Sequence, residues 1–176
     1  LLLAIPAGGL TVRFFIFAHD CGHGAFFSSK KANDFVGFWT SMLAYTPYKQ
    51  WRHGHALHHA SSGQIEERGV GYFWIMTAEE YAAASPLARF WYRFYRHPAV
   101  LISIGGIYAF LFEYRLSFRS TNADQRRGVW LTNLAMLGLY GGLAWLVGWK
   151  ALLLIQLPIC FVAATSGLVL FYLQHH

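Results

Sequence analysis

Two long apolar segments, 128–148 and 151–173, fill the C-terminal part of the 176-residue chain. Neither contains Asp, Glu, Lys or Arg, and each is as long as the roughly 20 residues that a helix needs to cross a hydrocarbon core of about 30 Å. Because only two residues separate them, the pattern predicts a tight helical hairpin that crosses a membrane twice. Residues 1–18, with Arg13 as their only charge, are predicted to form a third membrane-spanning helix.

Two further apolar stretches, 35–48 and 99–112, are only about 14 residues long and too short to cross as helices. We expect 35–48 to be re-entrant or to lie at the membrane surface. Arginines flank 99–112 on both sides, and the positive-inside rule keeps such flanks in the cytoplasm. This stretch is therefore predicted to dip into the membrane and return without crossing. The flanking residues are Arg89, Arg93 and Arg96 on one side and Arg115, Arg119, Arg126 and Arg127 on the other.

The composition favours a membrane protein over a soluble globule. Hydrophobic residues make up 56% of the chain and charged residues 12%, against about 25% charged residues in typical soluble domains. The aromatic share of 18% is typical of a bilayer protein, where Trp and Tyr gather at both interfaces. The net charge of +6 comes from scattered Lys and Arg, so cationic cytoplasmic loops explain it better than nucleic-acid binding. We therefore predict an all-α integral membrane protein, a bundle of transmembrane helices.

The ends of the chain and its cysteines bear on its organisation. The chain opens inside an apolar run without an initiator Met and stops directly behind another apolar run. We therefore expect residues 1–176 to be one domain, an internal fragment truncated at both ends. Two cysteines, Cys21 and Cys160, are too few for a disulfide framework.

Nine histidines carry most of the chemical information, and eight of them fall into three groups. The first group, HDCGH, occupies residues 19–23 at the end of the first predicted span. The second, HGHALHH, occupies 53–59, and the third is the pair His175 and His176 behind the last span. If the short apolar stretches do not cross the membrane, all three groups lie at the same membrane face. His97 stands alone and is interpreted as a surface or capping residue.

The spacing within the first two groups predicts shared metal ligation. Positions four apart lie on the same side of a helix, so His19 and His23 can reach one metal ion. His55, His58 and His59 stand at i, i+3 and i+4, again on one face. Five or six histidines exceed what one catalytic ion needs, which favours two ions. Imidazole binds Zn, Cu, Fe and Ni alike, so the ligand type leaves the metal open.

Two further residues are expected to surround the ligands. The helical register turns His53 away from the other three histidines of its group, so we interpret it as a supporting or surface residue. Asp20 is the carboxylate best placed to orient an imidazole. An equal alternative is that Asp20 is only a polar residue that faces the lipid headgroups.

Several segments resemble the membrane fatty acid desaturase family, above all its bacterial Δ12-type acyl-lipid members. They are HDCGHGAFF from His19, TPYKQWRHGHALHH over residues 46–59, the segment ERGVGYFW over residues 67–74, and the apolar hairpin before Gln174-His175. The resemblance implies a non-haem centre of two Fe ions, held by histidines on the cytoplasmic side of a four-helix bundle in the bacterial inner membrane. The ligands that it implies are His19, His23, His55, His58, His59 and His175. The family's third histidine box, another HxxHH, is missing from the chain.

The resemblance also implies an activity. Such proteins are O2-dependent desaturases that introduce a cis double bond into a fatty acyl lipid, with electrons from a donor such as ferredoxin or a cytochrome b5 type. Related di-iron hydroxylases, epoxygenases and ketolases share the boxes and remain alternatives. A metal transporter is disfavoured, because 128–148 and 151–173 contain no Asp, Glu, Lys, Arg or His for a path at mid-membrane.

Overall fold

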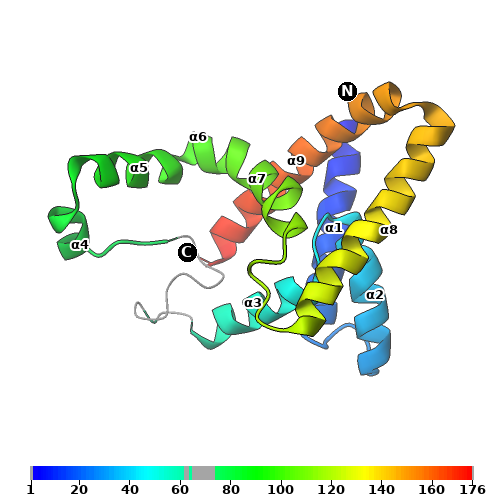
Figure 1. Ribbon diagram of the computed structural model, residues 1–176, viewed down its shortest axis with the longest axis horizontal. Helices are drawn as coiled ribbons and strands as arrows, with labels where there is room; N and C mark the ends of the chain where they lie inside the picture. Colours follow the sequence, from blue (N-terminus) through cyan, green and yellow to red (C-terminus); the bar gives the residue numbers. More distant parts are fainter. Residues whose placement is uncertain (1, 62–63, 65–73, 176) are drawn as a thin grey trace.

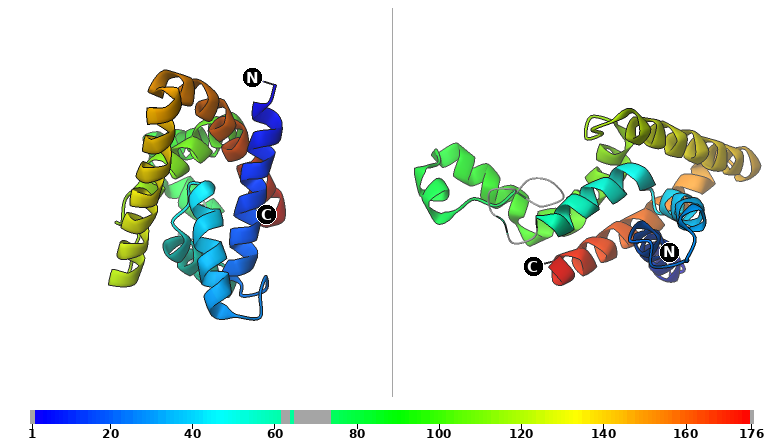
Figure 2. Two further views of the ribbon diagram at one scale, coloured as in Figure 1. Left: turned by 90° about the vertical axis from the view of Figure 1, so that its right-hand side faces the viewer. Right: turned by 90° about the horizontal axis from the view of Figure 1, so that it is seen from below.

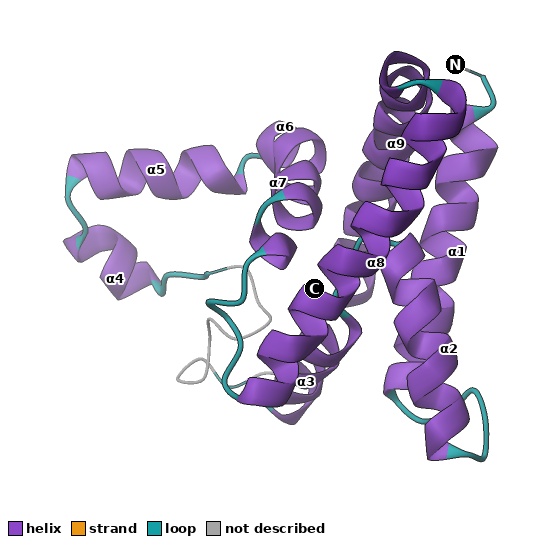
Figure 3. Cartoon of the chain, turned by 45° about the vertical axis from the view of Figure 1, so that its right-hand side comes forward, coloured by secondary structure: helices purple, strands orange, loops and turns teal. Residues whose placement is uncertain are grey.

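The computed structural model describes residues 2–61, 64 and 74–175, of which Tyr172, Gln174 and His175 are described by their backbone alone. Every regular element in this part of the chain is helical, as the sequence predicted (Figure 1). Long helices form a bundle, and the shorter helices between residues 78 and 96 project from its side (Figure 3).

Helices α1 (Ala4–Gly22) and α2 (Lys30–Leu43) lie side by side and run in opposite directions (Figure 2). The loop between them is closed by Asn33, which is buried. The Asn33 Nδ2 donates to the Phe27 carbonyl at 2.7 Å, and its Oδ1 accepts from the Phe27 N–H at 3.0 Å. Ser29 caps α2 by accepting a hydrogen bond from the N–H of the third helical residue at 3.4 Å.

The apolar stretch 35–48 is not a single structural element, because it covers most of α2, the turn after it and the first residue of α3. α2 begins five residues earlier, because Ser29 caps it there. It also ends five residues earlier, because Tyr45 adopts a left-handed backbone conformation with φ of 57°. After this turn α3 (Tyr48–Ala60) begins, and it carries the second histidine group.

The turn between α2 and α3 is anchored to the C-terminal helices through Tyr45. Its carbonyl accepts a hydrogen bond from the guanidinium of Arg115. Its hydroxyl accepts from Tyr140 at 3.0 Å and from the side-chain amide of Gln156. A left-handed conformation costs a non-glycine residue roughly 1–3 kcal/mol, and these hydrogen bonds offset that cost.

Helices α8 (Ala123–Val147) and α9 (Trp149–His175) form the predicted hairpin, with Gly148 as the single residue between them. Gly148 has φ of 84°, which glycine adopts without strain, and its N–H donates to the Ala144 carbonyl at 2.9 Å. In the described part of the chain, α8 and α9 are long and apolar enough to cross a membrane. Helix α1, predicted as a third span, does not meet this condition, because Arg13 and its polar last turn lower its mean hydropathy.

Helices α4 (Ala78–Ala83) and α5 (Pro86–Arg96) precede a helical segment, Pro98–Arg115, that α5 meets at an angle of 55°. This segment consists of α6 (Pro98–Val100), the π-helical turn η2 (Leu101–Gly105), α7 (Gly106–Leu111) and the 3-10 turn η3 (Glu113–Arg115). By length and composition, α5 and the segment are either one broken span or a re-entrant loop. The predicted dip of 99–112 is the second of these arrangements.

Helix α9 packs closely on α1 and α7 at two glycines. A Cβ at Gly8 of α1 would lie 2.5 Å from Val162 Cγ1, and one at Gly106 of α7 would lie 2.9 Å from the Ala164 carbonyl oxygen. Small residues of this kind allow helix backbones to approach each other in membranes. The hairpin therefore holds both α1 and α7 through its second helix.

Helix α3 is tied to the first turn of α8. The Lys49 Nζ and Asp124 Oδ1 atoms form an ion pair at 2.6 Å. A Cβ at Gly128 would lie 3.2 Å from the Lys49 side chain, so α3 and α8 are also in close contact there. The C-terminal end of α1, helix α3 and the start of α8 thus meet at one end of the bundle (Figure 1).

Candidate metal centre

The first two histidine groups come from two helices that meet at this end of the bundle. His19 lies in the last turn of α1, and His23 is the residue that ends this helix. His55 and His59 lie one turn apart on α3. Trp51 fills the contact between the helices, since its ring centroid lies 5.1 Å from that of Phe15 and 4.5 Å from that of His55.

Four imidazoles converge where α1 and α3 meet. One ring nitrogen each from His19, His23, His55 and His59 lies within 4.8 Å of the others. The Nε2 of His55 lies 3.0 Å from that of His23 and 3.1 Å from that of His59. Four of the five histidines predicted to converge form this group, and the fifth, His58, lies beside it, with its ring centroid 5.6 Å from that of His59.

The nitrogen spacing fits a bound metal ion better than hydrogen bonds. An imidazole nitrogen carries either one N–H or one lone pair, so the His55 Nε2 can form only one hydrogen bond at a time. Its two close neighbours cannot both be hydrogen-bond partners. Two nitrogens at about 2.1 Å from one ion are roughly 3.0–3.4 Å apart when the bond angle is about 90–110°. The His55 distances match this range, so the donor set fits a transition-metal ion.

The surroundings keep two of these imidazoles neutral, which leaves a lone pair for a metal. Burial lowers the pKa of His55 to about 3, and the neighbouring His19 adds to this effect. Burial also lowers the pKa of His23, again with His19 as the next cause. A protonated imidazole cannot bind a metal, so these shifts favour ligation at neutral pH.

The two residues predicted to surround the ligands lie in different places. The Asp20 Oδ1 lies 3.1 Å from the Nδ1 of His19, where it can accept the N–H of that ring. This contact would leave the Nε2 of His19 as the metal-binding atom. The His53 Nε2 instead lies 3.5 Å from the Thr121 Oγ1, outside the four-histidine group.

His58 lies beside the cluster, toward α9. It is buried, and its ring centroid lies 6.1 Å from that of His55 and 5.6 Å from that of His59. On its other side, the ring of Phe171 lies 6.0 Å away, so the C-terminal end of α9 reaches the second histidine group. His175 follows Phe171 by one helical turn, and its side chain lies outside the part that the structure describes.

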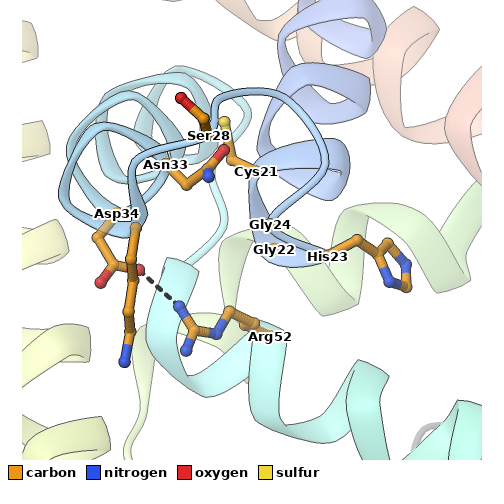
Figure 4. Close-up of a pocket in the computed structure, with 9 residues that line it drawn as sticks. Cys21, Gly22, His23, Gly24, Ser28, Asn33, Asp34 and Arg52 are labelled. Carbon is orange, nitrogen blue, oxygen red and sulfur yellow. Dashed lines mark hydrogen bonds and ion pairs between the residues drawn. The ribbon is translucent and has the colours of Figure 1, made fainter.

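A cavity of about 290 Å³ adjoins the cluster on the side of α2. Figure 4 shows His23 at its edge, pointing away from an ion pair between Asp34 and Arg52. The Arg52 guanidinium lies 2.5 Å from the Asp34 Oδ1 and joins α3 to α2. Sequence analysis missed this ion pair and the role of Trp51. The only signal for Trp51 was its position one turn before His55.

Comparisons with known proteins agree with the site. The model of the fatty acid desaturase family matches residues 1–176. The chain is 40% identical to a fatty acid desaturase of Bacillus subtilis over 175 residues, which cover 99% of this chain and 50% of that protein. It therefore spans about half the length of this relative.

Shorter matches come from desaturases of a plant and a cyanobacterium. An endoplasmic-reticulum omega-3 fatty acid desaturase of Vigna radiata is 45% identical over 63 residues, 35% of this chain and 17% of that protein. The sn-1 acyl-lipid omega-3 desaturase (ferredoxin) of Synechocystis is 41% identical over 59 residues, 34% of this chain and 16% of that protein. No solved structure matches the chain. The whole-length match of the family model and the Bacillus relative together show that the chain belongs to the fatty acid desaturase family.

Proposed function

We propose that the protein is an O2-dependent fatty acyl desaturase that uses two histidine-bound iron ions to introduce a cis double bond. One observation carries this proposal, namely the four imidazole nitrogens that lie within 4.8 Å of one another in a chain of this family. The four imidazoles supply ligands for iron. The apolar helices α8 and α9 would place these ligands beside membrane lipid.

We assign one iron to the four-histidine cluster and the second to His58 and His175. Two contacts support the second assignment: His58 is buried next to the cluster, and the end of α9 reaches it through Phe171. Asp20 orients His19, and His53 supports α3 from its other face through Thr121. We propose that further ligands of the second iron lie in parts of the protein that match the rest of the Bacillus subtilis relative, of which this chain covers 50%.

The chemistry divides between iron and the chain. Hydrogen removal from unactivated methylene groups is beyond acid–base side chains, and bound iron supplies the redox chemistry with O2. One O2, two electrons and two protons remove two hydrogens and yield the double bond and two waters. Burial lowers the pKa of His55 and desolvation lowers that of His23, which favours the neutral imidazoles that can bind iron, and Trp51 stacks on His55 at 17°. The protein thereby fixes the orientation of the ligands.

The electrons and the substrate come from partners. The name of the Synechocystis relative includes ferredoxin, which favours a donor of this kind, and a cytochrome b5 type is the second candidate. An acyl lipid is the proposed substrate, because the metal cluster lies at one end of a hairpin that can cross a membrane. We place the histidines on the cytoplasmic side of a bacterial inner membrane.

Expression of the intact gene in a host that lacks desaturases tests the function. Gas chromatography with mass spectrometry should show a new unsaturated fatty acid, and His55→Ala should abolish it. His53→Ala is the matched control and should keep substantial product, because His53 lies outside the cluster. Hydroxy, epoxy or keto products would assign one of the related di-iron reactions instead. Equal product from His55→Ala and the parent would overturn the proposed metal chemistry.

A further inference from the structure

Helix α5 presents a bare face of large apolar side chains. Leu87, Phe90, Trp91 and Phe94 are 66%, 54%, 55% and 45% exposed. Their spacing places them on one side of the helix. The three aromatic rings contact one another, with centroids 5.4–6.2 Å apart, so they form a continuous patch. Such a patch on a helix marks a surface that contacts a lipid or protein partner.

The opposite face of α5 carries Arg89, Arg93 and Arg96. Two of these guanidinium groups lie over tyrosine rings, Arg89 at 6.0 Å from Tyr81 and Arg96 at 5.7 Å from Tyr92. No carboxylate of the described residues forms an ion pair with any of the three arginines. The face is therefore cationic and has no internal counter-charge among these residues.

The two ends of the region around α5 lie on the same side of the bundle. Helix α3, which precedes it, is joined to Asp124 in the first turn of α8, which follows it, by the ion pair with Lys49 at 2.6 Å. His58 in the last turn of α3 lies beside Phe171 near the C-terminal end of α9, so the chain also leaves α3 at this end of the hairpin. The 55° bend between α5 and Pro98–Arg115 allows α5 to lie at an angle to a segment that enters the bilayer.

We propose that α5 lies in the membrane interface, with its apolar face in the outer acyl layer and its arginines on anionic phospholipid headgroups. This inference rests on the proposed crossing of the membrane by α8 and α9. Aromatic side chains with flanking arginines are typical of helices at this depth. Long arginine side chains reach the phosphates while the helix body stays among the acyl chains. Because the three arginines are positively charged, the partner is expected to be negatively charged, as an anionic lipid is.

Spin labels on the intact protein in vesicles test the inference. Single cysteines at Leu87, Phe90, Trp91 or Phe94 carry the label, in a Cys160→Ala background that retains the buried Cys21. Arg93→Cys and Glu79→Cys are the water-facing controls, and Leu137→Cys on α8 and Leu154→Cys on α9 are the lipid-facing controls. Power saturation with O2 and with a water-soluble nickel complex gives the ratio of lipid to water contact at each site. We expect a several-fold higher ratio on the apolar face than at Arg93 or Glu79.

The lipid headgroup is tested by a second comparison. In vesicles with added phosphatidylglycerol, the ratio at Trp91 should rise above its value in phosphatidylcholine alone. The triple variant Arg89→Gln/Arg93→Gln/Arg96→Gln should lose that rise. Equal ratios in both vesicles would overturn the role of anionic lipid.

Other outcomes identify a different partner. Water contact at all four apolar positions would overturn the interfacial position. Shielding of these positions from both reagents would show that protein covers α5, which also overturns it. Water contact at Leu137 and Leu154 would mean that the hairpin does not cross the membrane. It would overturn the proposed crossing by α8 and α9, on which this inference rests. Lipid contact at those two controls with water contact on α5 would leave the proposed function intact and remove only this inference.

Discussion

The Nε2 atoms of His23 and His55 lie 3.0 Å apart, although 32 residues separate the two histidines. Helical spacing explains the pairs within each helix, but it does not explain this contact between helices. The ring of Trp51 lies between α1 and α3, against Phe15 on one side and His55 on the other. The convergence of the four imidazoles therefore depends on this aromatic contact as well as on the spacing of the histidines.

Replacement of Trp51 by Ala should lower both stability and metal content. The change removes the ring that fills the contact between α1 and α3, and the loss of such a ring costs roughly 3 kcal/mol. Thermal unfolding in detergent and metal analysis of the purified intact protein would measure the two effects. Trp39→Ala is the control, because Trp39 is 45% exposed and its ring contacts are with Phe35 and Phe38 of its own helix. Equal metal content in both variants would contradict the role of Trp51.

Asp20→Asn should weaken metal binding by about 10- to 100-fold without removing a ligand. The neutral amide holds the His19 ring less strongly and lowers its basicity. Competition with a chelator of known affinity would measure the change in dissociation constant. Glu79→Gln on the exposed helix α4 is the control for the loss of one carboxylate and should leave the affinity unchanged. An unchanged affinity in Asp20→Asn would place Asp20 among residues that only face the headgroups.

Two adjacent glycines of α1 should respond in opposite directions to alanine. A Cβ at Gly8 meets Val162 Cγ1 at 2.5 Å, so Gly8→Ala should destabilise the α1–α9 contact by roughly 1–3 kcal/mol. Gly9 has no neighbouring atom within 4 Å of an added Cβ, so Gly9→Ala should stabilise the helix by up to about 1 kcal/mol. Thermal unfolding of both variants in the same detergent gives the comparison. The same shift in both would show that α1 does not pack on α9 at this point.

Cysteine labelling in whole cells should place the two ends of the hairpin on opposite sides. Arg126→Cys in the first turns of α8 should resist a membrane-impermeant reagent added outside, whereas Lys150→Cys after Gly148 should react. The reason is that one apolar helix separates the two positions. Arg96→Cys should resist the reagent like Arg126→Cys. Reaction of position 126 from outside would put this end of the hairpin, and the histidine cluster beside it, on the outer side of the membrane and would overturn the proposed cytoplasmic location.

Local features were predictable from the sequence. The convergence of His19 with His23 and of His55 with His59 follows from helical spacing, which does not depend on the rest of the fold. The hairpin of α8 and α9 was equally local, because two charge-free segments and a short connection define it.

Features that depend on tertiary contacts were not predictable. The start of α2 is fixed by Ser29 and by the hydrogen bonds of Asn33, and its end by the left-handed Tyr45. Tyr45 takes that conformation because of partners from α8, α9 and Arg115, which lie far along the chain. The position of His58 outside the four-histidine group also depends on neighbours that spacing does not reveal.

The ion pair between Lys49 and Asp124 links the helix that carries His55 and His59 to the first turn of α8. Spanning helices tilt when the bilayer is thinner or thicker than their apolar length. Because Lys49 joins α3 to the first turn of α8, and His58 touches Phe171 of α9, a tilt of the hairpin reaches the helix that carries His55 and His59. If α8 and α9 cross a membrane as proposed, we expect the separation between His55 and the histidines of α1 to vary with the thickness of the bilayer. If the protein acts as the proposed desaturase, the spacing of its histidines would then respond to the membrane whose lipids it alters.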